Sequence, residues 1–274
     1  MCIRDRPYLL FWAVVVSGLI IITDILFLKS RREKAAVIGL VAEERTSKNE
    51  KTSVAQPKLV EYAYSFFPVL LLVFVLRGFV AEPYQIPSES MVPTLEVGDF
   101  ILVSKYAYGL RMPVLGTKLL DVDQPKRGEM MVFVPPHDPR YFIKRVVGVP
   151  GDRIRYASKS LFVNGKRLPY QFVKEFRDPR FGIKVMEYEE LLGIVPHLVH
   201  KSPGYEPTQE WIVGEGEYLM MGDNRDRSED SRSWGMASEE NIVGKAVALW
   251  LHKDPGWNLP NFSRNKWFEY QEPL

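Results

Sequence analysis

The sequence contains a single cysteine, Cys2, close to the amino terminus. This scarcity excludes a disulfide within the chain, a zinc site built from several cysteines, a thioredoxin-like CxxC pair and a cysteine nucleophile in the folded body. The chain also lacks the GxSxG elbow, the Walker A loop, the HExxH helix and the GxGxxG fingerprint. We therefore expect neither a metal ion nor a cofactor.

An excess of charge of one sign is also missing, because 36 lysines and arginines face 34 aspartates and glutamates. No dense cationic cluster stands out in the body of the chain, so we do not expect nucleic acid as a partner. Histidine is scarce, with four in the whole sequence. Only His197 and His200 are close together, and we interpret them as a solvated surface pair, because an obvious third metal ligand is missing.

Long apolar runs are present, and both lie in the first third of the 274-residue chain. Residues 8–28 and 62–81 are each long enough for an α-helix to span a bilayer. For the first run the alternative is a cleaved signal peptide, but no small-x-small site follows it. For the second the alternative is a buried core helix, but its length and lack of polar periodicity favour the membrane. We expect two N-terminal transmembrane helices.

The cations beside these runs predict the topology, because lysine and arginine near the ends of a span remain in the cytoplasm. Residues 29–61 carry eight of them and residues 82–104 carry none. The connection 29–61 is therefore predicted to be cytoplasmic. In a bacterium, the chain after residue 81 then lies on the periplasmic or extracytoplasmic side of the inner (plasma) membrane, as part of a multi-pass protein in contact with membrane lipid.

Beyond the second run the sequence changes to short β-rich runs separated by glycine and proline, which predicts a mostly β domain over residues 82–252. Residues 166–209 are the least regular and are interpreted as a small inserted subdomain. The aromatic tail 253–274 either docks on the body or lies at the membrane interface. Seven strands are expected, at Phe100–Val103, Met130–Val134, Phe142–Val149, Arg153–Tyr156, Leu161–Val163, Tyr218–Met221 and Ile242–Trp250.

Two segments of this domain contain side chains that suit a hydrolytic site. In residues 86–95, two prolines define the backbone around Ser88 and Ser90, although a serine-rich linker is an equally good interpretation of this segment alone. In residues 141–148, strand alternation places Lys144 between apolar side chains, whereas most strand lysines lie at solvated edges. A desolvated lysine loses its proton more readily and can then activate a serine, as in Ser-Lys variants of the catalytic triad.

A third segment, residues 222–232, alternates three arginines with four acidic residues. A calcium-binding loop is one interpretation, but the positions that require glycine and a bidentate glutamate hold other residues, so it fails. We interpret the alternation as a self-neutralising network that fixes a loop.

Together, the three segments closely resemble the motif boxes of bacterial type I signal peptidase, also called leader peptidase. The matching stretches are Pro87–Leu95, Phe142–Asp152 and Met221–Arg232, and the resemblance extends from the two apolar runs to about Leu251. It implies coiled antiparallel sheets behind two membrane helices. It also implies a serine endopeptidase that removes N-terminal signal peptides from exported preproteins after an Ala-x-Ala-type site. We expect a monomer.

Residue by residue, the resemblance implies that Ser90 is the nucleophile and Lys144 the general base. It assigns the oxyanion hole to the Ser88 hydroxyl and the Ser90 backbone N–H, and the orientation of the lysine to Ser228. The resemblance further implies a supporting ion pair, a scaffolding acid and two shallow apolar substrate pockets. These comprise Asp230 with Arg232, then Asp223, and for the pockets Ile86, Met91, Leu95, Val132, Phe142 and Ile143.

One residue departs from the family pattern, since Glu89 occupies the position between the two serines where glycine is usual. Its carboxylate either faces solvent or adds negative charge to the oxyanion hole. The main alternative is therefore a catalytically silent, membrane-anchored β-rich binding domain. Self-cleaving repressor proteases share the Ser-Lys dyad, but they are soluble and carry a DNA-binding module, which does not match this chain.

Overall fold

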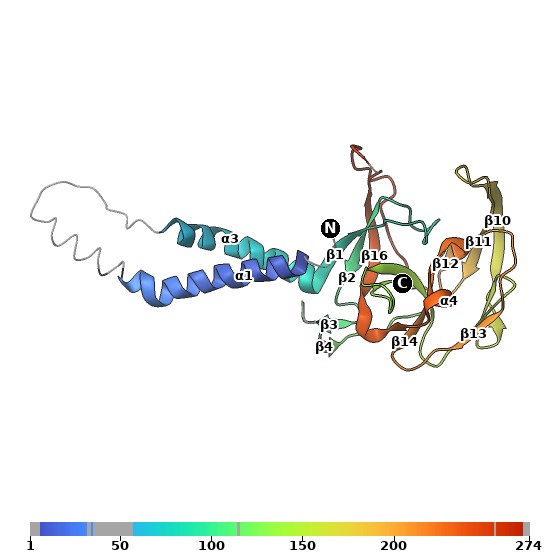
Figure 1. Cartoon of the computed structure of the whole chain (residues 1–274), viewed down its shortest axis with the longest axis horizontal. Coiled ribbons are helices and arrows are strands. Elements are labelled where there is room, and N and C mark those ends of the chain that lie inside the picture. The colour runs from blue at the N-terminus through green and yellow to red at the C-terminus, as the bar shows by residue number, and fades with distance from the viewer. Residues whose placement is uncertain (1–5, 32–33, 35–56, 114–115, 255, 271–274) are drawn as a thin grey trace, which may run out of the picture. The chain divides into compact units, whose positions relative to one another are not determined.

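The computed structural model describes residues 6–31, 34, 57–113, 116–254 and 256–270. The chain divides into two compact units, Met1–Gly78 and Phe79–Leu274, which are described separately. The described part of the first unit is helical, and the second consists mainly of strands (Figure 1). The predicted fold class, antiparallel β with two N-terminal apolar helices, is confirmed.

Two apolar helices make up the described part of the first unit. Stretches Tyr8–Arg31 and Lys58–Val80 are long and apolar enough to cross a membrane, with mean hydropathies of 2.5 and 2.1. Only 11% of each stretch is buried, which argues against a core helix of a soluble protein. Most of the predicted connection 29–61 lies outside the described residues. The helices are α1 (Arg6–Thr23), continued by a π-helical turn (Asp24–Leu28), and α3 (Lys58–Val75), continued by another (Leu76–Val80).

Close approach is possible between α1 and α3 because a glycine lies where they meet. The ring of Phe67 lies 3.2 Å from the position that a Cβ on Gly18 would occupy. Phe11 and Phe74 add an aromatic contact between the same helices, with ring centroids 6.0 Å apart.

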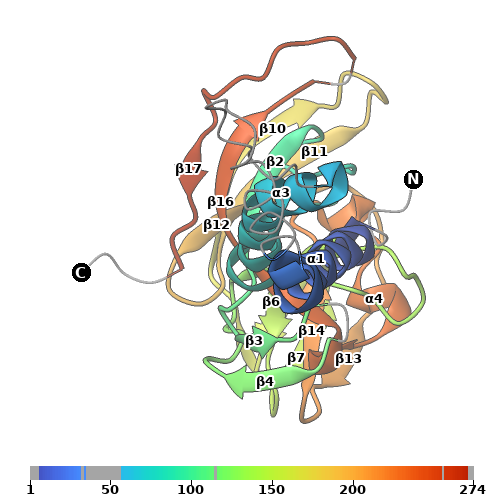
Figure 2. The same cartoon turned by 90° about the vertical axis from the view of Figure 1, so that its left-hand side faces the viewer.

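The second unit is organised around an eight-stranded antiparallel sheet in the order β1-β2-β16-β5-β6-β14-β15, with β17 paired to β16. Figure 2 shows β17 beside β16. This sheet contains β6, the strand that carries Lys144, between β5 and β14. Its strands are β1 (Ala81–Gln85), β2 (Asp99–Ser104), β5 (Met130–Phe133), β6 (Phe142–Gly148), β14 (Glu217–Met221), β15 (Ala237–Ser238), β16 (Ile242–His252) and β17 (Lys266–Trp267).

Three smaller antiparallel sheets complete this unit. The tight turn Asn164-Gly165 between β8 and β9 has positive φ at both residues, 51° and 80°, which asparagine and glycine tolerate best. All seven predicted strands are present, with ends that agree to within two residues. The smaller sheets contain β3 (Gly109–Arg111) with β4 (Lys118–Asp121); β13 (Gln209–Ile212), β7 (Arg153–Ala157), β8 (Ser160–Val163) and β9 (Lys166–Arg167); and β10 (Tyr170–Arg177), β11 (Lys184–Leu191) and β12 (Pro196–Lys201).

The expectation that residues 166–209 are the least regular is wrong, because half of them form the strands of the β10-β11-β12 sheet. Strand β10 is exposed along almost its whole length, so it has no buried apolar face to signal a strand. Buried and more exposed side chains do alternate along β11, but two of the buried ones are the charged residues Glu187 and Glu190. Hydrophobic periodicity therefore misses this sheet.

The described part of the C-terminal tail docks on the main sheet. Tyr270 donates its hydroxyl to the carbonyl of Ala246 at 2.7 Å, and Phe268 packs against the core cluster beneath β2 and β16. Trp257 and Trp267 remain largely exposed. Residues 266–270 therefore follow the first of the two alternatives for the tail, docking on the body.

Candidate active site

Ser90 and Lys144 meet within the second unit. Lys144 Nζ donates a hydrogen bond of 2.5 Å to Ser90 Oγ. Both residues are buried, with 8% and 3% of their surface exposed. A serine hydroxyl and a lysine amine in direct contact, shielded from water, have the geometry of a nucleophile and its base.

Strand β6 gives Lys144 its apolar surroundings. In the strand register Lys144 lies opposite Met131 of β5, and the Phe142 ring lies 5.6 Å from its Nζ. Val146, on the same face, is fully buried. The prediction that strand alternation places this lysine among apolar side chains is therefore confirmed.

Burial lowers the pKa of Lys144 from 10.5 to about 8, because the ammonium form loses its hydration. The carboxylates of Asp230, Asp223 and Glu229 oppose this shift by favouring the charged form. The result is an amine that is partly neutral near physiological pH, as a general base requires.

The next residue along β6, Arg145, points to the opposite face of the sheet and makes a buried ion pair. Its guanidinium donates to both oxygens of Asp223, at 2.8 and 2.6 Å, and to the carbonyl of Gly128 at 2.6 Å. Thr94 donates to Asp223 at 2.5 Å. Burial alone would raise the pKa of Asp223, but Arg145 outweighs it and the pKa falls to about 2.

The hydrogen bond from Thr94 to Asp223 ties the turn that carries Ser90 to the loop at 222–232, because Thr94 belongs to the turn and Asp223 to the loop. Sequence reasoning gave Asp223 a scaffolding role but overlooked Arg145 and Thr94. Strand alternation contained a signal for Arg145, since the neighbour of a lysine that faces one side of a sheet must face the other.

The backbone of the same loop also holds the serine directly. Asn224 donates its backbone N–H to the carbonyl of Ser90 at 3.1 Å, and its side-chain amide to the carbonyl of Glu89 at 3.1 Å. Gly222 permits this approach, because a Cβ at that position would lie 2.4 Å from the Ser90 carbonyl oxygen and 2.2 Å from Ser228 Oγ.

Ser88, the serine expected in the oxyanion hole, and Glu89, which departs from the family pattern, lie on different sides of this turn. Ser88 Oγ lies 3.3 Å from Ser90 Oγ, within reach of the reacting atoms. The carboxylate of Glu89 instead pairs with Arg180 and lies 3.8 Å from Arg227. The negative charge of Glu89 is therefore neutralised.

The prediction that the charges of the loop at 222–232 neutralise one another is wrong for most of them. Asp230 with Arg232, at 2.9 Å, is the ion pair within the loop among the described residues. The remaining charged side chains point in different directions and find partners on other segments. These pairs are Asp223–Arg145, Arg225–Glu190, Asp226–Lys159, Arg227–Asp178 and Glu229–His137.

Ser228, which was expected to orient Lys144, makes no hydrogen bond to it in this structure. Ser228 Oγ is enclosed and has no partner of normal hydrogen-bond geometry among the described residues. It lies beside Asp230, whose carboxylate accepts from Arg232 and from the backbone N–H of Gly222 at 3.0 Å. Burial would raise the pKa of Asp230, but the hydrogen bond from Arg232 outweighs it and the pKa is lowered.

The residues expected to line substrate pockets divide into two groups. Ile143 and Phe142 retain partly exposed surface on β6. Met91 and Leu95 have none, so in this conformation they offer no surface to a substrate. The buried group belongs to one core cluster and comprises Ile86, Met91, Leu95 and Val132.

The interpretation of His197 and His200 as a solvated pair is wrong, because both are buried on β12. His200 contacts Glu187 at 3.0 Å, and burial lowers the pKa of His197 to about 3, so that ring is neutral. In the described part of the chain, no three His, Cys, Asp or Glu side chains lie close enough to hold a metal.

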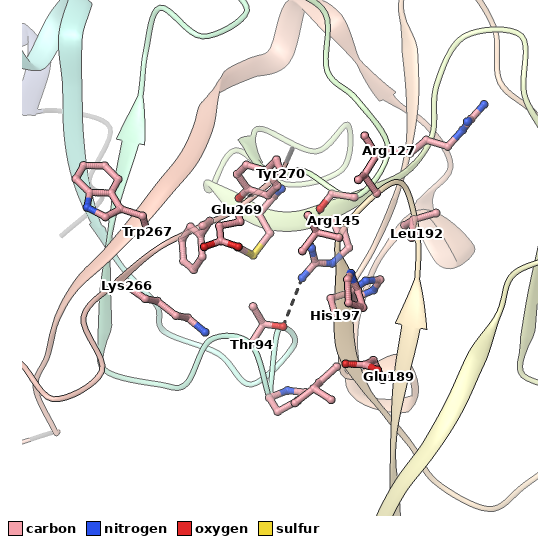
Figure 3. Close-up of a pocket in the computed structure, with 18 residues that line it drawn as sticks. Thr94, Arg127, Arg145, Glu189, Leu192, His197, Lys266, Trp267, Glu269 and Tyr270 are labelled. Atoms are coloured by element: carbon pink, nitrogen blue, oxygen red, sulfur yellow. Dashed lines mark hydrogen bonds between the residues drawn. The ribbon is translucent and has the colours of Figure 1, made fainter. Parts of the chain in front are cut away.

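His197 also lines a cavity of about 450 Å³ on the side of β6 to which Arg145 points. Figure 3 shows Thr94 hydrogen-bonded to Arg145 in this cavity, with Tyr270 of the tail nearby. The cavity lies on the side of β6 away from Lys144, because Lys144 and Arg145 face opposite sides of this strand.

The chain is similar to known proteins over most of its length. The family model described as "Signal peptidase, peptidase S26" matches residues 59–251. The chain belongs to this peptidase family. Signal peptidase I of Pseudomonas aeruginosa is 48% identical over 277 residues, which cover 94% of this chain and 96% of the relative. The enzyme of Pseudomonas fluorescens is 47% identical with the same coverage.

A more distant relative, signal peptidase I of Haemophilus influenzae, is 33% identical over 263 residues, with 77% of this chain and 74% of the relative covered. The predicted resemblance is thus confirmed. With its two apolar helices, this S26 peptidase is a membrane-anchored bacterial enzyme.

Proposed function

We propose that this S26 peptidase removes N-terminal signal peptides from exported preproteins, cutting after an Ala-x-Ala-type site with a Ser90–Lys144 dyad. The observation that carries the proposal is the 2.5 Å hydrogen bond between Lys144 Nζ and Ser90 Oγ inside an apolar site. The names of the relatives supply the substrate class.

The reaction begins when neutral Lys144 accepts the proton of the Ser90 hydroxyl as Oγ attacks the scissile carbonyl carbon. The Ser88 hydroxyl and the Ser90 backbone N–H stabilise the oxyanion of the tetrahedral intermediate. Lys144 then returns the proton to the leaving amine, which departs as the new N-terminus and leaves an acyl ester on Ser90. Water, deprotonated by Lys144, attacks this ester, and the collapse of the second intermediate returns the proton to Ser90 and releases the signal peptide.

The membrane topology supports this assignment. Ser90 follows the second apolar helix, which ends at Val80, by ten residues. The cation-rich connection 29–61 supports a cytoplasmic location for the two helix ends that flank it. The β unit then acts as a monomer on the extracytoplasmic side, where an exported preprotein presents its cleavage site at the lipid surface.

The pairing of Glu89 removes the main argument for a silent binding domain. That alternative required an uncompensated carboxylate in the oxyanion hole, whereas Glu89 is neutralised by Arg180. Ser90 is also in contact with both Ser88 and Lys144.

The test is cleavage of a preprotein with an Ala-x-Ala signal by the full chain in detergent. We expect wild type to cleave, and Ser90→Ala and Lys144→Met to be inactive. Lys201→Met is the matched control, because Lys201 is equally buried and burial lowers its pKa to about 8 as well, but it contacts Tyr170 and Tyr188 rather than Ser90.

Two results would overturn the proposal. A wild-type protein without activity would leave the chain as a binding domain, and cleavage by Lys144→Met would mean that another group is the base. A preprotein with leucine in place of the alanine before the cut should resist cleavage. Equal cleavage of both substrates would refute the small-residue specificity.

A further inference from the structure

Glu89 places a carboxylate directly beside the residues proposed to stabilise the oxyanion, since it lies between Ser88 and Ser90 in the chain. Free negative charge at this position opposes the negative charge that develops on the carbonyl oxygen in the transition state. The side chain therefore needs a restraint that neutralises it and keeps it away from the two hydroxyls.

Arg180 supplies that restraint from a distant part of the sequence. It lies in the turn between β10 and β11 and donates a hydrogen bond to one carboxylate oxygen of Glu89. This hydrogen bond is the main reason that the pKa of Glu89 is lowered. Arg227 lies 3.8 Å from the other oxygen but donates to Asp178 instead.

Further contacts make this Glu89 cluster (Glu89, Asp178, Arg180, Phe181 and Arg227) a defined structure. The guanidinium groups of Arg180 and Arg227 lie 5.4 and 4.7 Å from the centre of the Phe181 ring. Asp178 accepts the backbone N–H of Arg180 at 2.9 Å and thereby fixes the turn. Contacts within its own hairpin thus hold Arg180 in place in addition to the contact with Glu89.

The rest of the catalytic turn is held from the other side. Asn224 binds the carbonyls of Glu89 and Ser90, but neither contact reaches Ser88. Ser88 is exposed, and its hydroxyl lies 3.3 Å from Ser90 Oγ. The conformation at Glu89 therefore controls how the Ser88 hydroxyl faces the nucleophile.

We propose that Arg180 is a positioning residue for the Ser-Lys reaction: it neutralises Glu89 and holds its carboxylate at the β10–β11 turn, away from the hydroxyls of Ser88 and Ser90. The inference rests on the proposed function, because it concerns the rate of that reaction. It also gives the β10–β11 hairpin a role in catalysis, although this hairpin contributes none of the reacting groups.

The test is a double-mutant cycle on the full chain in detergent, with kcat and KM measured for preprotein cleavage. Arg180→Gln frees the carboxylate, so kcat should fall about five-fold while KM changes little. Glu89→Gln removes the charge itself and should stay within about two-fold of wild type. The double variant should match Glu89→Gln, because no carboxylate beside the two serines is then left for Arg180 to neutralise.

Arg153→Gln is the matched control, because Arg153 makes a similar exposed ion pair with Glu210, between β7 and β13. It should leave kcat unchanged. An Arg180→Gln enzyme with the kcat of wild type would overturn the inference. Losses of kcat that add up in the double variant would also overturn it, and so would losses that follow the melting temperature, since these indicate a structural role. In all three cases wild type and Ser90→Ala still report on the proposed function, which fails separately if wild type does not cleave.

Discussion

Lys144 Nζ donates to Ser90 Oγ across a separation of 54 residues in the sequence, and the distance between the two atoms is 2.5 Å. The contact joins a central strand of the main sheet to an irregular turn. Both ends are fixed independently, Lys144 by the β6 register and Ser90 by its backbone contact with Asn224. Preorganisation of this kind lowers the entropic cost of bringing nucleophile and base together.

The first prediction concerns the pH dependence of cleavage. The base must be neutral in the free enzyme, and the pKa of Lys144 is lowered to about 8. kcat/KM should therefore rise about ten-fold per pH unit below pH 8 and level off above it. A profile measured from pH 6 to pH 10 with one preprotein gives the answer, and a flat profile through pH 8 would contradict the assignment of Lys144.

The second prediction is that burial of Lys144, which suits its role as a base, lowers the free energy of unfolding. Its pKa is about 8 in the folded protein, whereas the ordinary value for a lysine in water is 10.5, so below pH 8 the fold holds a poorly hydrated ammonium group. At pH 7, Lys144→Met should raise the free energy of unfolding by about 3 kcal/mol. Between pH 8 and 10.5 the unfolded state binds more protons, so wild type gains stability with rising pH and the difference shrinks.

Urea denaturation at pH 7 and at pH 10 measures this difference. Lys166→Met is the control, because Lys166 is exposed on β9 and its removal relieves no desolvation. If Lys144→Met were less stable than wild type at pH 7, burial would not be the main cause of its lowered pKa.

The third prediction concerns the buried Arg145–Asp223 pair. Asp223→Asn leaves the fully enclosed guanidinium without its counter-ion, so the free energy of unfolding should fall by about 4 kcal/mol. Asp138→Asn, which disrupts an exposed pair with Arg140, is the control and should keep the wild-type denaturation midpoint.

Acid should reproduce part of this loss, about 2 kcal/mol, in the wild-type protein. The pKa of Asp223 is lowered to about 2 in the fold, from an ordinary value of 3.8. Its stabilisation is present above pH 3.8 and disappears as pH falls through about 2. Equal pH dependence in wild type and Asp223→Asn over this range would show that the pair does not contribute.

The fourth prediction concerns Gly222. A Cβ at this position would lie 2.4 Å from the Ser90 carbonyl oxygen, so Gly222→Ala must push the loop away from the nucleophile. A displacement of about 1 Å at the reacting atoms is expected to reduce kcat about 100-fold. Gly214→Ala is the control, since its Cβ would meet only the movable carboxylate of Glu217. Wild-type kcat in Gly222→Ala would refute the close approach.

Local sequence patterns predicted much of this protein correctly. Alternation in β6 placed Lys144 among apolar side chains, and tight turns such as Asn164-Gly165 marked strand ends. The two apolar runs became helices because a helix satisfies its backbone hydrogen bonds within one segment and needs no partner strand. These features depend on neighbours a few residues apart, which a single sequence contains.

Other features depended on partners far apart in the chain. Glu190 on β11 is buried because Arg225, 35 residues away, donates to it, so its strand shows no apolar pattern. The charge of Glu89 is neutralised by Arg180, 91 residues away. The sequence by itself determined the two apolar helices, seven strands of the β unit and the chemistry available at Ser90 and Lys144. Only the tertiary structure decided which charges meet, because ion pairs form between distant segments and depend on how the sheets pack.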